Sequence, residues 1–79
     1  MQTVRVQDSE SRLRYRVVIE PSSTGFSAYA PDLPGCVATG HGLAEVARNI
    51  ESAIDLHLAG MREDGEPIPA PTTGALQPV

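Results

Sequence analysis

The stretch Pro31-Asp32-Leu33-Pro34-Gly35-Cys36 decides the fold, because it is the most rigid part of the chain and separates two strand-like segments. Each proline fixes its own φ and biases the preceding residue, Ala30 or Leu33, toward extended geometry. Gly35 accepts a positive φ at little steric cost, which suits a turn into a new strand. The stretch therefore predicts a stiff connection between strands. A second reading makes it a surface ridge that a partner contacts, with Asp32 as its charged group.

Two strands are predicted before this stretch. Residues 12–20 alternate, with four apolar side chains on one face and mainly arginines on the other, which is typical of a half-buried strand. Residues 21–25 have turn chemistry, and residues 26–30 alternate again. The short turn predicts an antiparallel hairpin. Residues 3–7 alternate weakly, so they form either an extra edge strand or a loose tail.

A third strand and a long helix are predicted after the stretch. Residues 36–40 form a short strand of small side chains, and residues 43–64 form a helix with Gly42 as N-cap and Gly65 as the stop. One apolar stripe recurs along this helix at steps of three and four residues. Its members are Leu43, Val46, Ala47, Ile50, Ala53, Ile54, Leu58 and Met61.

Prolines at alternate positions mark the tail. Pro67, Pro69 and Pro71 would leave one edge of an extended segment without N–H donors. Residues 67–71 are therefore expected to form an edge strand that pairs on one side only, or else a solvated polyproline-like arm. Residues 72–79 show no clear order. The fold expected is α+β, a single domain over residues 1–79 with a core over 12–71 and the order β-β-β-α-β.

Composition limits the classes of function. A chain of 79 residues with one cysteine has a small core and no internal disulfide, so a dimer or larger assembly is expected. The net charge of −4 argues for a basic protein partner. The short arginine cluster of Arg5, Arg12, Arg14 and Arg16 does not predict nucleic-acid binding. The sequence shows no membrane span and no signal peptide, which predicts a cytoplasmic protein.

Catalytic groupings are not evident. His41 and His57 have no partners at useful spacing, and Cys36 reads as a small buried side chain rather than a reactive thiol. Neither a metal nor a cofactor is expected. An alternative hypothesis is a minimal metal-dependent nuclease built from carboxylates. Its candidate ligands are Glu20, Asp32, Glu51 and Asp55.

Several motifs together resemble the HicB antitoxin family: the run 31–36, the helix after Gly40, and Asp64-Gly65-Glu66-Pro67-Ile68-Pro69. The resemblance covers about residues 14–71. It implies a partial RNase H-like fold without catalytic activity, in which a three-stranded sheet and a last edge strand pack on one helix. It also implies a partner, a small basic HicA-like toxin that cleaves mRNA and whose active surface the antitoxin covers.

Two features depart from the family pattern. His41-Gly42 stands where members usually carry Asp-Thr before the helix, although glycine also caps adequately. Many members add an operator-binding domain, and no segment of this chain is expected to form one. The function predicted is masking of a HicA-like toxin, with a self-associating scaffold as a further alternative. The partner-binding residues predicted are Asp32, Glu45, Glu51 and Asp55.

Overall fold

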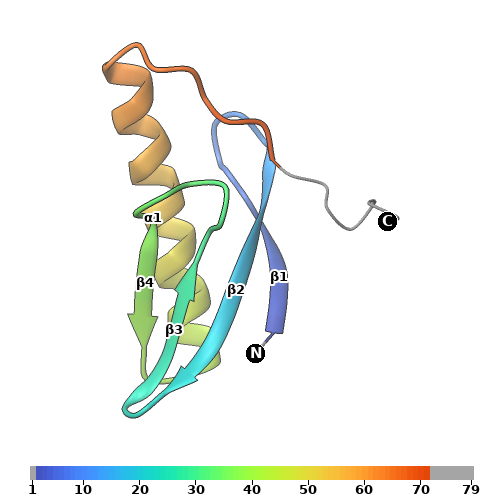
Figure 1. Cartoon of the computed structure of the whole chain (residues 1–79), viewed down its shortest axis with the longest axis vertical. Coiled ribbons are helices and arrows are strands. Elements are labelled where there is room, and N and C mark those ends of the chain that lie inside the picture. The colour runs from blue at the N-terminus through green and yellow to red at the C-terminus, as the bar shows by residue number, and fades with distance from the viewer. Residues whose placement is uncertain (1, 72–79) are drawn as a thin grey trace.

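Four antiparallel strands form one sheet, and a single helix lies against one of its faces (Figure 1). The computed structural model describes residues 2–71. The elements are β1 (Gln2–Gln7), β2 (Arg14–Ser22), β3 (Gly25–Tyr29), β4 (Val37–Gly40) and α1 (Leu43–Glu63). The strands lie in chain order, β1-β2-β3-β4, so each strand pairs with its neighbours in sequence. The α+β class and the predicted three-strand meander followed by a helix are confirmed.

The sheet register follows from the alternation in β2. Tyr15, Val17 and Ile19 point to the helix side and are buried. Arg14, Arg16, Val18 and Glu20 therefore lie on the opposite face, which we call the outer sheet face. In the register of β1 on β2, Val4 pairs with Val17 and Arg5 with Arg16. The weakly alternating start of the chain is thus an edge strand, with its two valines packed against the core.

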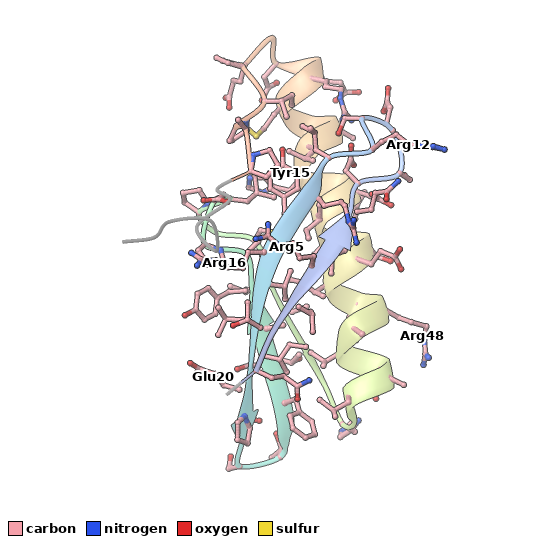
Figure 2. All side chains as sticks on the ribbon, turned by 90° about the vertical axis from the view of Figure 1, so that its right-hand side faces the viewer. Arg5, Arg12, Tyr15, Arg16, Glu20 and Arg48 are labelled. Atoms are coloured by element: carbon pink, nitrogen blue, oxygen red, sulfur yellow. The ribbon has the colours of Figure 1, made fainter. Side chains whose placement is uncertain are left out.

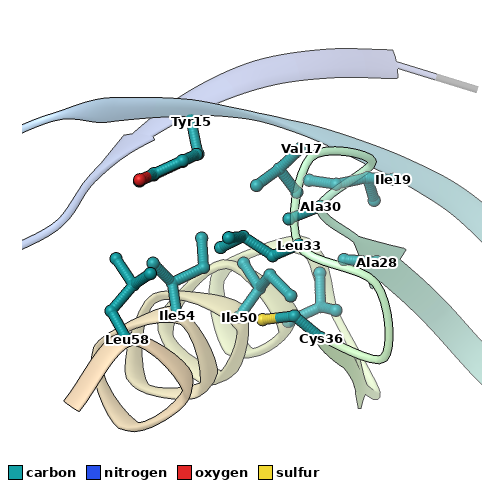
Figure 3. Packing of buried hydrophobic residues seen from close by; sticks show 11 residues of the cluster. Tyr15, Val17, Ile19, Ala28, Ala30, Leu33, Cys36, Ile50, Ile54 and Leu58 are labelled. Carbon is teal, nitrogen blue, oxygen red and sulfur yellow. The ribbon is translucent and has the colours of Figure 1, made fainter. Parts of the chain in front are cut away.

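The core lies between the inner sheet face and one line of the helix (Figure 3). Its helical members are fully buried at four-residue steps: Val46, Ile50, Ile54 and Leu58. This line is narrower than the predicted stripe. Leu43, in the first turn, is 44% exposed, and Ala47 is also exposed. The sheet contributes small residues as well as large ones, which lets the helix approach β3 and β4.

Residues 30–36 act as the stiff connection that the prolines predicted. Leu33 is fully buried between sheet and helix, as Figure 3 shows. The loop closes on itself, because the N–H of Ala30 donates to the carbonyl of Cys36 and the N–H of Cys36 donates to the carbonyl of Leu33. Gly35 has a φ of 86°, as a turn of this kind requires. Cys36 is buried, and burial raises the pKa of its thiol.

The helix ends in the manner predicted. Gly42 is the N-cap, and Gly65 follows the C-cap with a φ of 71°. The N–H of Gly65 donates to the carbonyl of Arg62, and the N–H of Glu66 donates to that of Met61. This pair of bonds is a Schellman motif, which satisfies carbonyls that the last turn would otherwise leave unpaired. It also directs the following chain back toward the sheet (Figure 1).

The predicted edge strand at residues 67–71 is wrong, because these residues pair with no strand. Instead, they run from the end of α1 back to the start of β2 (Figure 1). The hydroxyl of Tyr15 donates to the carbonyl of Pro69 at 2.6 Å, and Ile68 packs against the core. The edge beside β2 is already taken by β1. The predicted tail at residues 72–79 lies outside the described residues.

Boundaries also shift at the start of β2. The predicted strand began at residue 12, whereas β2 begins at Arg14. The reason is a tight turn in which the N–H of Arg12 donates to the carbonyl of Asp8 and the N–H of Asp8 donates to the carbonyl of Leu13. Arg12 takes a φ of 68° to close this turn, so it cannot belong to the strand.

Two glycines offer a matched test of this packing. A Cβ at Gly40 would lie 2.6 Å from the Val46 nitrogen and 2.8 Å from its Cα, so helix and β4 would have to separate. Gly40→Ala should lower the free energy of unfolding by about 1–3 kcal/mol. Gly60 is helical with open space around it, so Gly60→Ala should raise the free energy of unfolding by up to about 1 kcal/mol. Urea titrations measure both, and equal effects would contradict the packing.

Candidate functional site

The solvent-facing side of α1 carries most of the predicted partner-binding residues. Glu51 and Asp55 are one turn apart and neighbours on the helix surface. Glu45 lies about 15 Å along the axis from Asp55, at 1.5 Å per residue. Asp32 comes from the loop between β3 and β4, where it is half-buried. The structure therefore brings two of the four residues together and spreads the others.

Glu45 is held by the residue before the N-cap. The main-chain N–H of His41 donates to Glu45 Oε1 at 3.0 Å, and His41 Nδ1 lies 3.5 Å from the same oxygen. This backbone hydrogen bond is the main reason why the pKa of the Glu45 carboxyl lies below its usual value. A carboxylate at this position is also stabilised by the positive end of the helix dipole. Glu45 thus has a structural role at the helix start as well as an exposed charge.

A shallow pocket adjoins Glu45 at this end of the molecule. It measures about 200 Å³ and opens widely to solvent. The side-chain amide of Asn49 lines it and donates to the carbonyl of Thr39 at 2.7 Å, which ties helix to β4. The lining residues are Thr24, Phe26, Thr39, Gly40, His41, Glu45 and Asn49.

Asp55 faces the turn between β1 and β2. Its Oδ1 accepts the main-chain N–H of Ser9 at 3.1 Å. The same turn is joined to the end of the helix by Arg62, which donates to Asp8 Oδ2 at 2.8 Å and to Glu10 Oε1 at 2.9 Å. These bonds join the turn between β1 and β2 to α1.

Asp8 is the buried member of this group, with 1% of its surface exposed. Burial alone would raise the pKa of its carboxyl. Hydrogen bonds from the hydroxyl and the N–H of Ser11, together with Arg62, outweigh burial and lower that pKa below 3.8. Within residues 2–71, Asp8 Oδ1 is buried without a hydrogen-bond partner. The sequence showed only a polar turn here.

An exposed leucine lies on the outward side of the helix. Leu56 is 74% exposed, the highest value among the exposed large apolar side chains of the described residues, which also include Tyr29, Val37 and Leu43. It follows Asp55 and lies off the buried line of the helix. The sequence analysis did not select it, although a leucine outside the apolar stripe can be recognised from the spacing alone. We define the acidic helix face as the exposed side of α1 that carries Leu56 and four carboxylates, with Arg48 among them. The carboxylates belong to Glu45, Glu51, Asp55 and Glu63.

The outer sheet face has the opposite charge. Arg5 lies directly across from Arg16, and Arg14 lies across from Gln7. Figure 2 shows Arg16 and Arg48 pointing to opposite sides of the molecule, one from the sheet and one from the helix. Next to the arginines is an apolar row in which Val18, Tyr29 and Val37 pair across three strands. Three arginines and one carboxylate, Glu20, thus lie on the outer sheet face, whereas most exposed side chains with negative charge lie on the helix.

The carboxylates of the nuclease hypothesis do not converge. Glu20 lies on the outer sheet face, whereas Glu51 and Asp55 lie on the helix beyond the other face. Over the part of the chain that the structure describes, no three His, Cys, Asp or Glu side chains are grouped so as to hold a metal ion. Likewise, no helix in that part has the length and apolar character that a membrane span requires.

Comparison with known proteins identifies the family. The family model described as "HicB_like antitoxin of bacterial toxin-antitoxin system" matches residues 15–77. The chain belongs to the HicB-like antitoxin family. The motifs at 31–36 and 64–69 therefore pointed to the right family, and both lie inside the matched range.

Individual relatives and structures agree with this assignment. The HicB-like chain is 40% identical over 55 residues to an uncharacterized 14.9 kDa protein of Haemophilus phage HP1, covering 70% of this chain and 41% of that one. It is 43% identical over 47 residues to a UPF0150 protein of Helicobacter pylori, covering 60% and 65%. It therefore spans about two fifths and two thirds of the lengths of these relatives.

Two solved structures share the fold at 32% identity over 75% of this chain. One is the HicA3 and HicB3 toxin-antitoxin complex, with a TM-score of 0.66 and 69% of that chain covered. The other is the crystal structure of the antitoxin HicB3, with a TM-score of 0.65 and 43% covered. The RNase H-like likeness implied by the resemblance stays a prediction.

The buried carboxylate of Asp8 predicts a pH dependence. Since its pKa is lower in the folded chain, its contribution to stability is complete above the unfolded value of 3.8 and is lost as the pH falls through the folded value. Asp8→Asn should lower the free energy of unfolding by about 1–3 kcal/mol at pH 7, and by much less near pH 2.

The matched control is Glu10→Gln, which alters the exposed partner of the same arginine. Glu10 is 70% exposed, so this change should cost less than about 1 kcal/mol at either pH. Urea unfolding at the two pH values measures both variants. An Asp8→Asn effect that is independent of pH would contradict the assignment.

Proposed function

We propose that this HicB-like chain is an antitoxin-type binding protein that covers the RNA-cleaving surface of a small basic HicA-like toxin. The observation that carries the proposal is the likeness of its sheet and helix to HicB3, a protein solved in complex with HicA3. Membership of a family described as antitoxins supports it. In this proposal the chain acts in the cytoplasm by steric and electrostatic masking and carries out no catalysis of its own.

The acidic helix face is the surface proposed for the toxin. Six acids and two arginines lie between Leu43 and Glu66, so this side of the molecule attracts a basic protein. Leu56 supplies an exposed apolar side chain on the same helix, which a partner could bury beside the charges. The hydrogen bonds of Glu45 and Asp55 to the main chain keep the surface in place before binding.

Asp32 has a secondary place in this proposal. It lies in the rigid loop at 30–36, where the buried side chain of Leu33 fixes the backbone. A partner large enough to extend beyond the helix would meet this loop as a preformed ridge. Glu51 and Leu56 are the better test positions, because both are exposed and neither forms part of the core.

Charge reversal on the acidic helix face tests the proposal. The partner is a small basic protein encoded next to this chain, purified in a catalytically inactive form. Glu51→Arg should slow its association and make binding less sensitive to salt, and Leu56→Ala should speed dissociation. Together they should weaken binding at least about tenfold, since buried anchors of an interface carry most of its energy. Surface plasmon resonance measures both rates.

Glu20→Arg is the matched control, because it makes the same charge change on the outer sheet face. It should leave affinity within about twofold, as expected of a charge outside the interface. Equal losses for Glu20→Arg and Glu51→Arg would place the toxin elsewhere. The antitoxin proposal fails if no toxin is encoded nearby and expression of this chain never restores growth to cells that express candidate toxins.

A further inference from the structure

The turn between β1 and β2, residues 8–12, is joined to α1 beside the acidic helix face. The N–H of Ser9 donates to Asp55 Oδ1 at 3.1 Å, and Arg62 donates to Glu10 Oε1 at 2.9 Å. Two positions of the turn are therefore bonded to two positions of the helix. A partner that contacts the carboxylate of Asp55 also meets this turn, because the turn is already within hydrogen-bond distance of the same carboxylate.

The turn adds charges of both signs to that surface. The buried Asp8 and the exposed Glu10 share Arg62, so two carboxylates meet one guanidinium and a net negative charge remains beside α1. The side chain of Glu10 is 70% exposed. Arg12, which takes a φ of 68° where main-chain hydrogen bonds close the turn, is exposed as well.

The arginines on this side of the molecule lie on either side of its adjacent acids. Figure 2 shows Arg12 and Arg48 pointing to the same side, away from the sheet, at different heights along the helix. Glu51 and Asp55 follow Arg48 along α1, and Asp55 lies about 10 Å beyond it at 1.5 Å per residue, where it meets the turn. The two neighbouring carboxylates are thus placed between Arg48 and the turn that carries Arg12.

The turn and the helix differ in their relation to the family pattern. The match to the family model begins at residue 15, so β1 and the turn lie before it, whereas α1 lies within it. The helix therefore belongs to the pattern that members share. Side chains that distinguish one partner from a related one are expected outside such a pattern, and the turn is the part of this surface that lies there.

We propose that the turn at residues 8–12 selects the toxin. Glu10 extends the attractive surface beyond the helix, and Arg12 excludes basic proteins that have no acidic group at the matching position. The inference rests on the proposed function and adds the chemistry of the partner, a basic surface with a carboxylate at its edge. Like charges brought together across an interface weaken binding, and such repulsion is one of the two ways in which a protein distinguishes related partners.

A charge reversal in the turn tests the selection. The two partners are the toxin encoded next to this chain and HicA3, each in a catalytically inactive form. Arg12→Glu should weaken binding of the adjacent toxin at least about fivefold and strengthen binding of HicA3, because the repulsion then acts on the other partner. Arg12→Gln removes the charge and should give intermediate values. All three residues carry a Cβ, so the cost of the positive φ at this position is similar.

The ratio of the two dissociation constants, measured by surface plasmon resonance, is the readout. A ratio that falls at least about tenfold in Arg12→Glu supports the selection. An unchanged ratio, or weaker binding of the adjacent toxin with no gain for HicA3, overturns it.

Glu10→Gln provides the second measurement. It should slow association of the adjacent toxin about twofold to fivefold, as expected for a charge at the edge of an interface. Glu20→Gln, on the outer sheet face, is the matched control and should leave the rate unchanged. Equal rates for the two variants overturn the role of Glu10. If Glu51→Arg and Leu56→Ala weaken binding while the variants of the turn do not, this inference fails and the proposed function stands. If the unmodified chain does not bind the adjacent toxin, both fail.

Discussion

The buried line of α1 against the inner face of the sheet is the interaction on which the rest of the structure depends. Val46, Ile50, Ile54 and Leu58 are fully buried, and Leu33 enters the same layer from the loop. Burying one such side chain contributes about 1.5–3 kcal/mol. In a chain of 79 residues there are few of them, so each is a large part of the total stability. A single helix covers one face only, and the other face of the sheet has to be compatible with water.

The charge distribution follows from that arrangement. The alternation that buries Tyr15 and Val17 necessarily places Arg14 and Arg16 on the outer sheet face. The acids of α1 lie off its buried line, with Asp55 against the turn between β1 and β2 and Glu51 exposed to solvent. The sheet face therefore carries an excess of arginines and the helix an excess of acids, although the net charge is only −4. A charged partner experiences this separation before contact, and it sets the orientation in which the two proteins meet.

Local pattern was sufficient for most of the fold. Alternation identified β2 and its buried residues, and proline and glycine chemistry identified the connection at 30–36 and the end of the helix. Spacing also showed that Glu51 and Asp55 are neighbours. The fate of residues 67–71 was not predictable in this way, because alternate prolines suit an edge strand and a crossing arm equally. The contact that decides it, Tyr15 with Pro69, joins residues 54 apart. The Asp8–Arg62 pair is likewise a contact between distant segments.

The order of the strands has a consequence for the speed of folding. Each strand pairs with the one that precedes it, and the helix follows β4 directly and packs on it. Most loops that must close on the way to the native state are therefore short, and domains with such local contacts are the quick folders among small proteins. The contacts of Tyr15 with Pro69 and of Asp8 with Arg62 close the longest loops. They join the turn between β1 and β2 and the start of β2 to the end of the helix and the segment that follows it.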